Sequence, residues 1–389
     1  MARKTLKVKV NPDIIKWARD SSGLDLETIK KKLRVTLETI RAWEDGTRKP
    51  TLRTLEMLAS LYKRPLATFL LPQPPYEPAL PPDFRAVPRE QRQVLSSKTR
   101  LAIRKARRLQ IIVTEMMEQK TVEKPVVTVG KTLLTEDPEL VAERERGKLG
   151  VSIKDQFKFR SVYDAFNKWR VALENYNIAV LQEQMAPEEV RGFSLLDHLV
   201  PTIVISRSDS IRARIFTLFH EYAHLLLGTE GICRPDEASP DNADEEEVEK
   251  FCNHFAGAFL VPKQALRADE NASLIARVHD LDNSILNQIA ARFKVSNQVI
   301  LRRLLICQLI SKKQYQDKLR EVQSQVKRAE HPFKMPASKR CISEKGRLFV
   351  SLALEAKERD LITYSDLADY LSIDLKHLDK LEATLSLKG

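Results

Sequence analysis

Apolar residues recur at helical spacing along most of the chain, and one short run of branched residues breaks that pattern. In residues 97–119, Ala102, Ala106 and Leu109 fall three or four positions apart, as on one face of an α-helix. Residues 202–206 read Thr-Ile-Val-Ile-Ser, which has the length and composition of a β-strand. The pattern therefore predicts a mainly α protein with a small β-sheet, of the α+β class.

Residues 12–71 predict four or five short helices with clear start and stop signals. Asp25 and Thr36 stand at expected N-cap positions, because their side-chain oxygens can accept the free N–H groups of a first helical turn. Gly46 ends the helix that Thr36 begins, and Thr51, which follows a proline, begins the next one. Two short helices joined by a brief turn form a helix-turn-helix arrangement, so we expect a five-helix domain of this type.

Six prolines between residues 72 and 82 interrupt the helical pattern. Proline has no backbone N–H and a fixed φ, so such a segment is extended and fairly stiff. A second break, which contains proline and lysine, precedes the last helical stretch. We therefore predict a helix-turn-helix domain (1–71), a linker (72–96), a larger domain (97–320) and a helical C-terminal module (332–389).

The segment Thr36–Thr51 reads TLETIRAWEDGTRKPT and contains the pattern Trp-Glu-x-Gly-x-x-x-Pro. It resembles the recognition helix and following turn of phage-repressor (XRE-type) helix-turn-helix domains. Two positions depart from that family, because Lys30 stands where alanine is usual and Arg34 where glycine is usual. The resemblance implies a helix that lies in the major groove of DNA, with the residues of its N-terminal half on base edges.

The DNA-contact set that this resemblance implies is Thr36, Leu37, Glu38, Thr39, Arg41, Ala42, Arg48 and Lys49. The base-reading positions carry Leu37, Glu38 and Ala42, none of which is a usual arginine, lysine, asparagine or glutamine reader. The three basic residues of the set can hold phosphates, which position a protein on DNA without specifying a sequence. Two interpretations therefore stay open for this domain, DNA binding and contact with another protein.

Residues 220–224 read His-Glu-Tyr-Ala-His. Positions four apart lie about 40° apart around a helix and about 6 Å apart along it, so His220 and His224 can bind one tetrahedral zinc ion. Glu221 lies on the adjoining face, where it can hold the water that the metal activates. The alternative is two core histidines that merely accept hydrogen bonds.

A catalytic zinc ion needs a third protein ligand and one open position. Downstream of the two histidines, Glu249 enters an apolar helical stripe, where a carboxylate needs a partner that zinc would supply. His254 is a rival ligand, but it lies about 140° around the helix from Glu249. Cys252 is a second rival, and we interpret it as a core residue.

Residues 216–226 and 249–262 read FTLFHEYAHLL and EKFCNHFAGAFLVP. Together they resemble the two hallmark segments of the ImmA/IrrE family of metallo-endopeptidases. Nearly the whole chain is similar to the subgroup that carries an XRE-type domain in front of the peptidase. The resemblance implies that residues 97–320 form a zincin-like peptidase domain with zinc as its cofactor. It assigns the role of zinc ligand to His220, His224 and Glu249. It assigns the role of general base to Glu221.

Several side chains near the motif are candidates for stabilising an oxyanion, and none of them is singled out by the sequence. They are Tyr222, His254, Arg212 and Arg214. Residues 284–304 form a further helix-turn-helix pattern, which is usual in this peptidase family, and we expect it to support or cover the catalytic domain. Residues 362–378 repeat the two-helix pattern, and we interpret them as solvated surface.

The formal net charge of +12 is unevenly distributed. The first 110 residues hold 25 Lys and Arg against 11 Asp and Glu, whereas residues 227–250 hold 2 against 9. A basic balance indicates nucleic acid or another anionic surface as a partner. The 11 glycines include no glycine-rich phosphate loop, which argues against a nucleotide site of that kind.

The four cysteines are scattered without a Cys-x-x-Cys pair, which suits a reducing cytosol better than a disulfide framework. No apolar run reaches the ~18 residues that a membrane-spanning helix needs. We therefore expect a cytoplasmic protein with no membrane partner, and the sequence leaves its oligomeric state open.

These features predict a zinc-dependent endopeptidase and transcriptional regulator that cleaves a repressor-type regulatory protein, with DNA bound through the N-terminal domain. The alternative is a DNA-binding regulator or antitoxin-like protein whose peptidase-like domain senses a signal or binds a partner. A closed structural zinc site is disfavoured, because such sites mostly use four cysteines or histidines.

Overall fold

The computed structural model divides the chain into two compact units. One comprises residues 1–80 and 91–105, and the other residues 81–90 and 106–389. The structure describes residues 6–77, 95–118, 130–186, 188–229, 232–233, 243–278, 281–324 and 335–386. Most of the predicted linker lies outside the described residues, so its boundaries stay a prediction.

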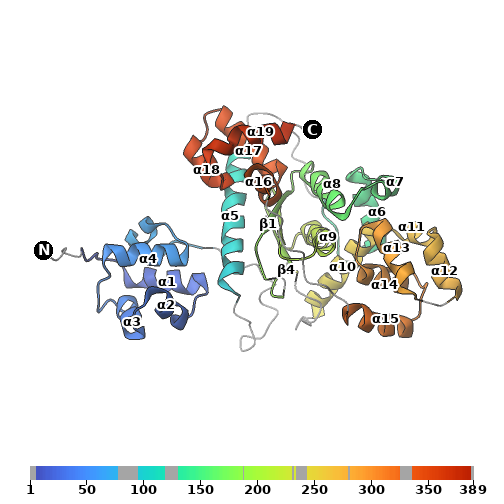
Figure 1. Cartoon of the computed structure of the whole chain (residues 1–389), viewed down its shortest axis with the longest axis horizontal. Coiled ribbons are helices and arrows are strands. Elements are labelled where there is room, and N and C mark those ends of the chain that lie inside the picture. The colour runs from blue at the N-terminus through green and yellow to red at the C-terminus, as the bar shows by residue number, and fades with distance from the viewer. Residues whose placement is uncertain are drawn as a thin grey trace. The chain divides into compact units, whose positions relative to one another are not determined.

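The first unit is helical (Figure 1). Its elements are α1 (Pro12–Ser22), α2 (Leu26–Leu33), α3 (Leu37–Glu44), α4 (Leu52–Tyr62) and the 3-10 helix η1 (Leu66–Leu70). The side chains of Asn11, Asp25, Thr36 and Thr51 each accept a backbone N–H at the start of a helix. The prediction of a five-helix domain is confirmed, and its fifth segment is a 3-10 helix.

The turn between α2 and α3 explains one departure from the repressor pattern. Arg34 ends α2 with a φ of 55°, in the left-handed region that glycine adopts without strain. The N–H of Val35 then bonds the carbonyl of Lys30 at 3.3 Å, which closes the end of α2. Arg34 therefore keeps the turn geometry for which the family uses glycine.

Helix α5 (Ser97–Glu118) crosses the boundary between the two units at residues 105 and 106. The remaining helices belong to the second unit. They are α6 (Pro138–Lys148), α7 (Ile153–Phe157), α8 (Val162–Glu174), α9 (Ile211–Leu227), α10 (Ala243–Leu260), α11 (Lys263–Arg267), α12 (Glu270–Val278), α13 (Asn283–Phe293), α14 (Asn297–Ile306), α15 (Lys312–Ser324), α16 (Ala337–Lys345), α17 (Arg347–Glu358), α18 (Tyr364–Leu371), the 3-10 helix η3 (Leu375–His377) and α19 (Leu378–Ser386).

The second unit also contains a small mixed sheet. Its strands are β1 (Ala179–Glu183), β2 (Gly192–Leu195), β3 (Thr202–Ser206) and β4 (Ile232–Cys233), in the order β1-β3-β2-β4. Strand β1 pairs with β3 in parallel, whereas β2 runs antiparallel to both β3 and β4. The predicted strand at residues 202–206 is confirmed, and so is the α+β class.

The hydrophobic core of the second unit is built around Trp169 of α8, which is fully buried. Its ring makes edge contacts with Phe159, Phe219 and Phe259 at centroid distances of 5.6, 5.1 and 5.4 Å. Phe219 of α9 stacks on Phe259 of α10 at 4.0 Å. This aromatic cluster therefore holds together the three helices α8, α9 and α10.

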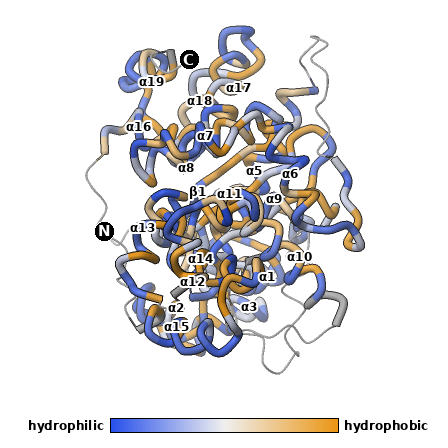
Figure 2. The backbone as a smooth tube through the Cα atoms, turned by 90° about the vertical axis from the view of Figure 1, so that its right-hand side faces the viewer, coloured by the Kyte–Doolittle hydropathy of each residue, from blue (hydrophilic) through white to orange (hydrophobic). Residues whose placement is uncertain are grey.

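Figure 2 shows hydrophobic and hydrophilic positions alternating around most of the helices, as the sequence pattern predicts. Helix α16 packs on strand β1, and a buried ion pair fixes it there. Arg170 contacts Glu174 at 3.1 Å and donates to the carbonyl of Ser343 at 2.6 Å. Among the described residues, none of the helices combines the length and apolar character needed to span a membrane.

We expect Trp169→Ala to lower the free energy of unfolding of the second unit by about 3–5 kcal/mol, because it leaves a cavity between three helices. Urea unfolding followed by circular dichroism measures this change. Tyr163→Ala on the same helix is the matched control, since this side chain is 54% exposed. The control should change stability by less than about 0.5 kcal/mol, and equal effects would contradict the central role of Trp169.

Candidate metal centre

Helix α9 presents both motif histidines to the interior of the second unit. Its first turn is capped by Ser210, whose hydroxyl accepts the N–H of Ala213 at 3.3 Å. Its last turn ends at Gly228, which has a φ of 68° and needs the conformational freedom of glycine. Between these caps the helix is mainly apolar, and it buries His220 and His224 to 1% exposure.

Helix α10 brings Glu249 to the two histidines. The Nε2 atom of His220 lies 3.3 Å from Glu249 Oε2, and that of His224 lies 3.2 Å from Glu249 Oε1. The two Nε2 atoms are 3.2 Å apart. All three side chains offer a ligand atom within 4.8 Å of one another, so they form a group that can hold a metal ion. The Glu249 side chain is 31% exposed, and solvent reaches the group from its side.

The outer ring nitrogens of both histidines are also engaged. His220 Nδ1 lies 3.1 Å from Asn253 Oδ1, which can only accept a hydrogen bond, so the ring proton sits on Nδ1. His224 Nδ1 lies 3.2 Å from the hydroxyl of Thr229, which itself donates to the His224 carbonyl at 3.3 Å. Both rings therefore hold Nδ1 in a hydrogen bond and turn Nε2 toward Glu249, so Nε2 is the ring atom that can bind a metal once it carries no proton.

The electrostatics of the group favour a positive charge at its centre. Burial acts to lower the pKa of His220, but the Glu249 carboxylate outweighs it and raises that pKa to about 9. Burial acts to raise the pKa of Glu249, but His220 and His224 hold it well below its usual range. A cation, whether a proton or a metal ion, is therefore stabilised among these three side chains.

Glu221 is fully buried beside strand β2. Burial raises its pKa to about 7, and the nearby histidines and a hydrogen bond with Ser194 partly offset that rise. Gly192 lets the strand approach, because a Cβ atom there would lie 2.5 Å from Thr217 Cγ2 and 3.4 Å from Glu221 Oε1. The close packing of β2 on α9 thus fixes the position of this carboxylate.

The rival ligands lie elsewhere. His254 directs its Nε2 to Glu139 at 2.8 Å, and Cys252 is fully buried in the core. Two of the oxyanion candidates are also engaged away from the group, since the Tyr222 hydroxyl donates to Glu145 at 2.8 Å and His254 contacts Glu139. Neither Tyr222 nor His254 is therefore placed to stabilise an oxyanion in this arrangement.

Sequence reasoning missed Asn253, Thr229, Ser194 and Gly192. Asn253 stands four residues after Glu249, on the same helical face. This spacing could have indicated that Asn253 lies near the two histidines. Thr229 comes two residues after the end of α9 at Leu227, and the two β2 residues come from a segment that precedes α9. Nothing local in the sequence connects Ser194 and Gly192 to the histidines.

The predicted DNA-contact residues lie at the N-cap of α3, on α3 itself and in the segment after it. Glu38, Arg41, Arg48 and Lys49 are exposed, and Arg48 donates to the hydroxyl of Thr39 at 3.3 Å. Thr36 is the exposed N-cap of α3, and Ala42 lies half-buried on that helix. Leu37 is half-buried and packs against the core of the first unit.

Helices α13 and α14 form the second helix-turn-helix pattern that the sequence indicates. Helix α14 packs against α10, and Val299, Ile300, Leu301 and Leu304 are all buried. Within α14 Arg302 is the one exposed residue, so this helix offers little surface to a DNA groove. The arrangement favours the supporting role expected from the sequence.

Comparisons with known families bear on both units. Residues 173–305, which contain His220, His224 and Glu249, match the peptidase family model described as the IrrE N-terminal-like domain. Residues 15–69 match a helix-turn-helix model. The chain therefore joins an IrrE-type peptidase-family domain to an N-terminal helix-turn-helix domain. Among curated proteins, none matches the chain.

We expect Glu249→Gln to lose bound divalent metal, because an amide carries no charge and is a weaker ligand than a carboxylate. Mass spectrometry of the purified native protein and titration with a chromogenic chelator measure the metal content. Glu247→Gln is the matched control, since Glu247 is exposed on the same helix. Metal retention in Glu249→Gln would contradict a role for this residue as a ligand.

Proposed function

We propose that the chain is a zinc-dependent endopeptidase, with His220, His224 and Glu249 as ligands. The observation that carries this proposal is the convergence of two imidazole nitrogens and one carboxylate inside a peptidase-family domain. Catalytic zinc sites use three protein ligands of these types and keep a fourth position for water or substrate. The exposed side of Glu249 supplies a route for both.

When bound, zinc polarises the scissile carbonyl and makes a water molecule a stronger nucleophile. Glu221 is the general base in this proposal. Its carboxylate accepts a proton from the attacking water and delivers it to the leaving amine. Ser194 and the close approach of β2 hold that carboxylate in place, while Asn253 and Thr229 keep both imidazoles correctly oriented.

For the substrate we propose a regulatory protein of the repressor type, in line with a peptidase domain joined to a helix-turn-helix domain. In this proposal Arg41, Arg48 and Lys49 contact DNA phosphates from their exposed positions around α3. The phosphate contacts would supply most of the affinity, since Leu37, Glu38 and Ala42 offer little base readout.

We expect Glu221→Gln to keep its zinc and its fold but to lose activity by about 10²–10⁴-fold, because the amide cannot take a proton. Quantitative proteomics of cells that carry either form should reveal a regulator that accumulates only with the variant. Glu247→Gln serves as the control. Unchanged proteolysis in Glu221→Gln would favour the alternative, in which the peptidase-like domain is a sensor or binding module.

We expect Arg41→Ala and Arg48→Ala each to weaken DNA binding and to reduce the slope of log affinity against log salt by roughly 1. Fluorescence anisotropy with duplex DNA at several salt concentrations measures both quantities. Lys16→Ala on α1 is a matched control, since Lys16 is an exposed cation outside the contact set. If no duplex binds the wild-type protein, the domain contacts a protein instead.

A further inference from the structure

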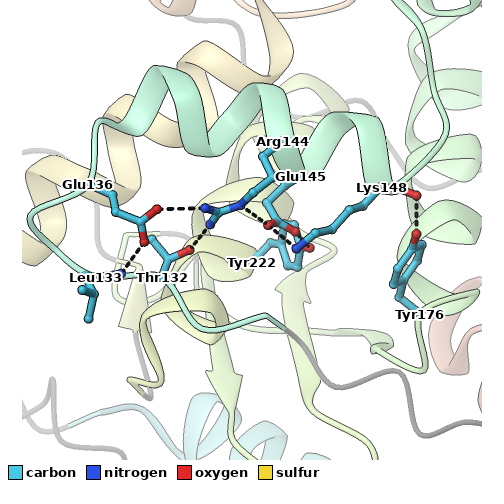
Figure 3. A network of polar contacts seen from close by, with 8 residues as sticks. All are labelled: Thr132, Leu133, Glu136, Arg144, Glu145, Lys148, Tyr176 and Tyr222. Carbon is cyan, nitrogen blue, oxygen red and sulfur yellow. Dashed lines mark hydrogen bonds and ion pairs between the residues drawn. The ribbon is translucent and has the colours of Figure 1, made fainter.

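Helix α6 contacts both of the helices that carry the metal-binding group. It comprises Pro138–Lys148, so it lies before the segment that matches the peptidase family. Figure 3 shows the polar network along this helix. Two of its carboxylates, Glu139 and Glu145, bond side chains of α10 and α9 respectively.

The contact with α9 is made through the middle of the histidine motif. The hydroxyl of Tyr222, which stands between His220 and His224, donates to Glu145 Oε2 at 2.8 Å. Glu145 is 1% exposed, and its charge is balanced by Lys148 at 2.8 Å and Arg144 at 3.1 Å. Because Tyr222 is about 160° around the helix from His224, this bond holds α9 from the side away from the ligands.

The contact with α10 uses the rival ligand His254. Its Nε2 atom lies 2.8 Å from Glu139 Oε1, and it stands about 140° around the helix from Glu249. Glu139 also pairs with Arg303 of α14, whose side chain is fully buried and whose Nη2 atom lies 2.9 Å from Oε2. A buried arginine fixes this carboxylate firmly, because leaving either charge alone would be costly.

We infer that α6 sets the geometry of the metal centre, with Glu139 and Glu145 as positioning residues. The ligands come from two helices, so their spacing depends on how each helix is rotated about its own axis. Glu145 fixes the rotation of α9 and Glu139 that of α10, and one rigid helix carries both carboxylates. A displacement of about 1 Å among the groups of a catalytic or binding site strongly reduces its catalytic rate or its affinity. This inference rests on the proposed metallopeptidase function.

The test uses purified full-length protein and Zn²⁺ alone as the probe, with affinity measured by competition against a chromogenic chelator. Tyr222→Phe removes only the hydroxyl that reaches Glu145. Tyr176→Phe is the matched control, because its hydroxyl bonds the Lys148 carbonyl of the same helix but lies outside α9 and α10 (Figure 3). Circular dichroism and thermal unfolding of the metal-free forms show whether each variant is folded.

We expect Tyr222→Phe to bind zinc about 10–100-fold more weakly than the wild type, the range seen when partners of metal ligands are removed. Tyr176→Phe should bind like the wild type. For the second contact, His254→Leu should weaken zinc binding, and His254→Gln should restore it, because its amide N–H can still donate to Glu139. If Tyr222→Phe does not fold, the zinc affinities of the two His254 variants decide whether α6 positions the metal-binding residues.

Equal zinc affinity in all folded variants would overturn the inference, even if some of them unfold at lower temperature, because the contacts would then be merely structural. A wild type that binds no zinc would instead refute the proposed function. A wild type that binds zinc normally but cleaves nothing would refute the peptidase activity and leave the positioning role intact. The three outcomes are therefore distinguishable.

Discussion

The candidate metal centre of His220, His224 and Glu249 depends on placing two imidazoles and a carboxylate together in the interior of a folded domain. Ionisable side chains taken out of water are strongly destabilising unless each finds a partner. Here Glu249 faces both histidines at 3.2 and 3.3 Å, and Asn253 and Thr229 accept from the outer ring nitrogens. The group is satisfied on every side except the one that solvent reaches.

That arrangement constrains the architecture around it. The two histidines and Glu249 come from α9 and α10, and Phe219 and Phe259 stack between the same two helices at 4.0 Å. Trp169 of α8 packs edge-on against Phe219 of this pair. Strand β2 packs closely on Glu221, because Gly192 has no side chain. Helix α6 contacts both α9 and α10, through the buried carboxylate of Glu145 and the half-buried carboxylate of Glu139. The apolar core and the polar contacts thus fix the same geometry.

The first unit has a small apolar core and carries basic residues on its surface. Its small core is stabilised by well-capped short helices, and its basic residues Arg41, Arg48 and Lys49 on and after α3 are exposed. Arg34 shows how closely the turn geometry is kept, since a non-glycine residue adopts a left-handed conformation to preserve it. The basic residues near α3 are available to an anionic partner without any rearrangement of the core.

Much of the local structure was predictable because it depends on neighbouring residues. The caps at Asp25, Thr36 and Thr51, the strand at residues 202–206 and the helical turn that aligns His220 with His224 all follow from short-range spacing. These features need no knowledge of the rest of the chain, because capping bonds and helical periodicity act over a few residues.

The sequence by itself therefore determined the short capped helices of the first unit, the strand at residues 202–206, the pairing of the two histidines on one helical face and the family likeness of both domains. Only the tertiary structure decided which groups of α10 face the histidines, that His254 turns to Glu139 and that Tyr222 turns to Glu145. The physical reason is that periodicity fixes angles within one helix. The rotation of one helix relative to another is fixed by packing among residues far apart in the chain.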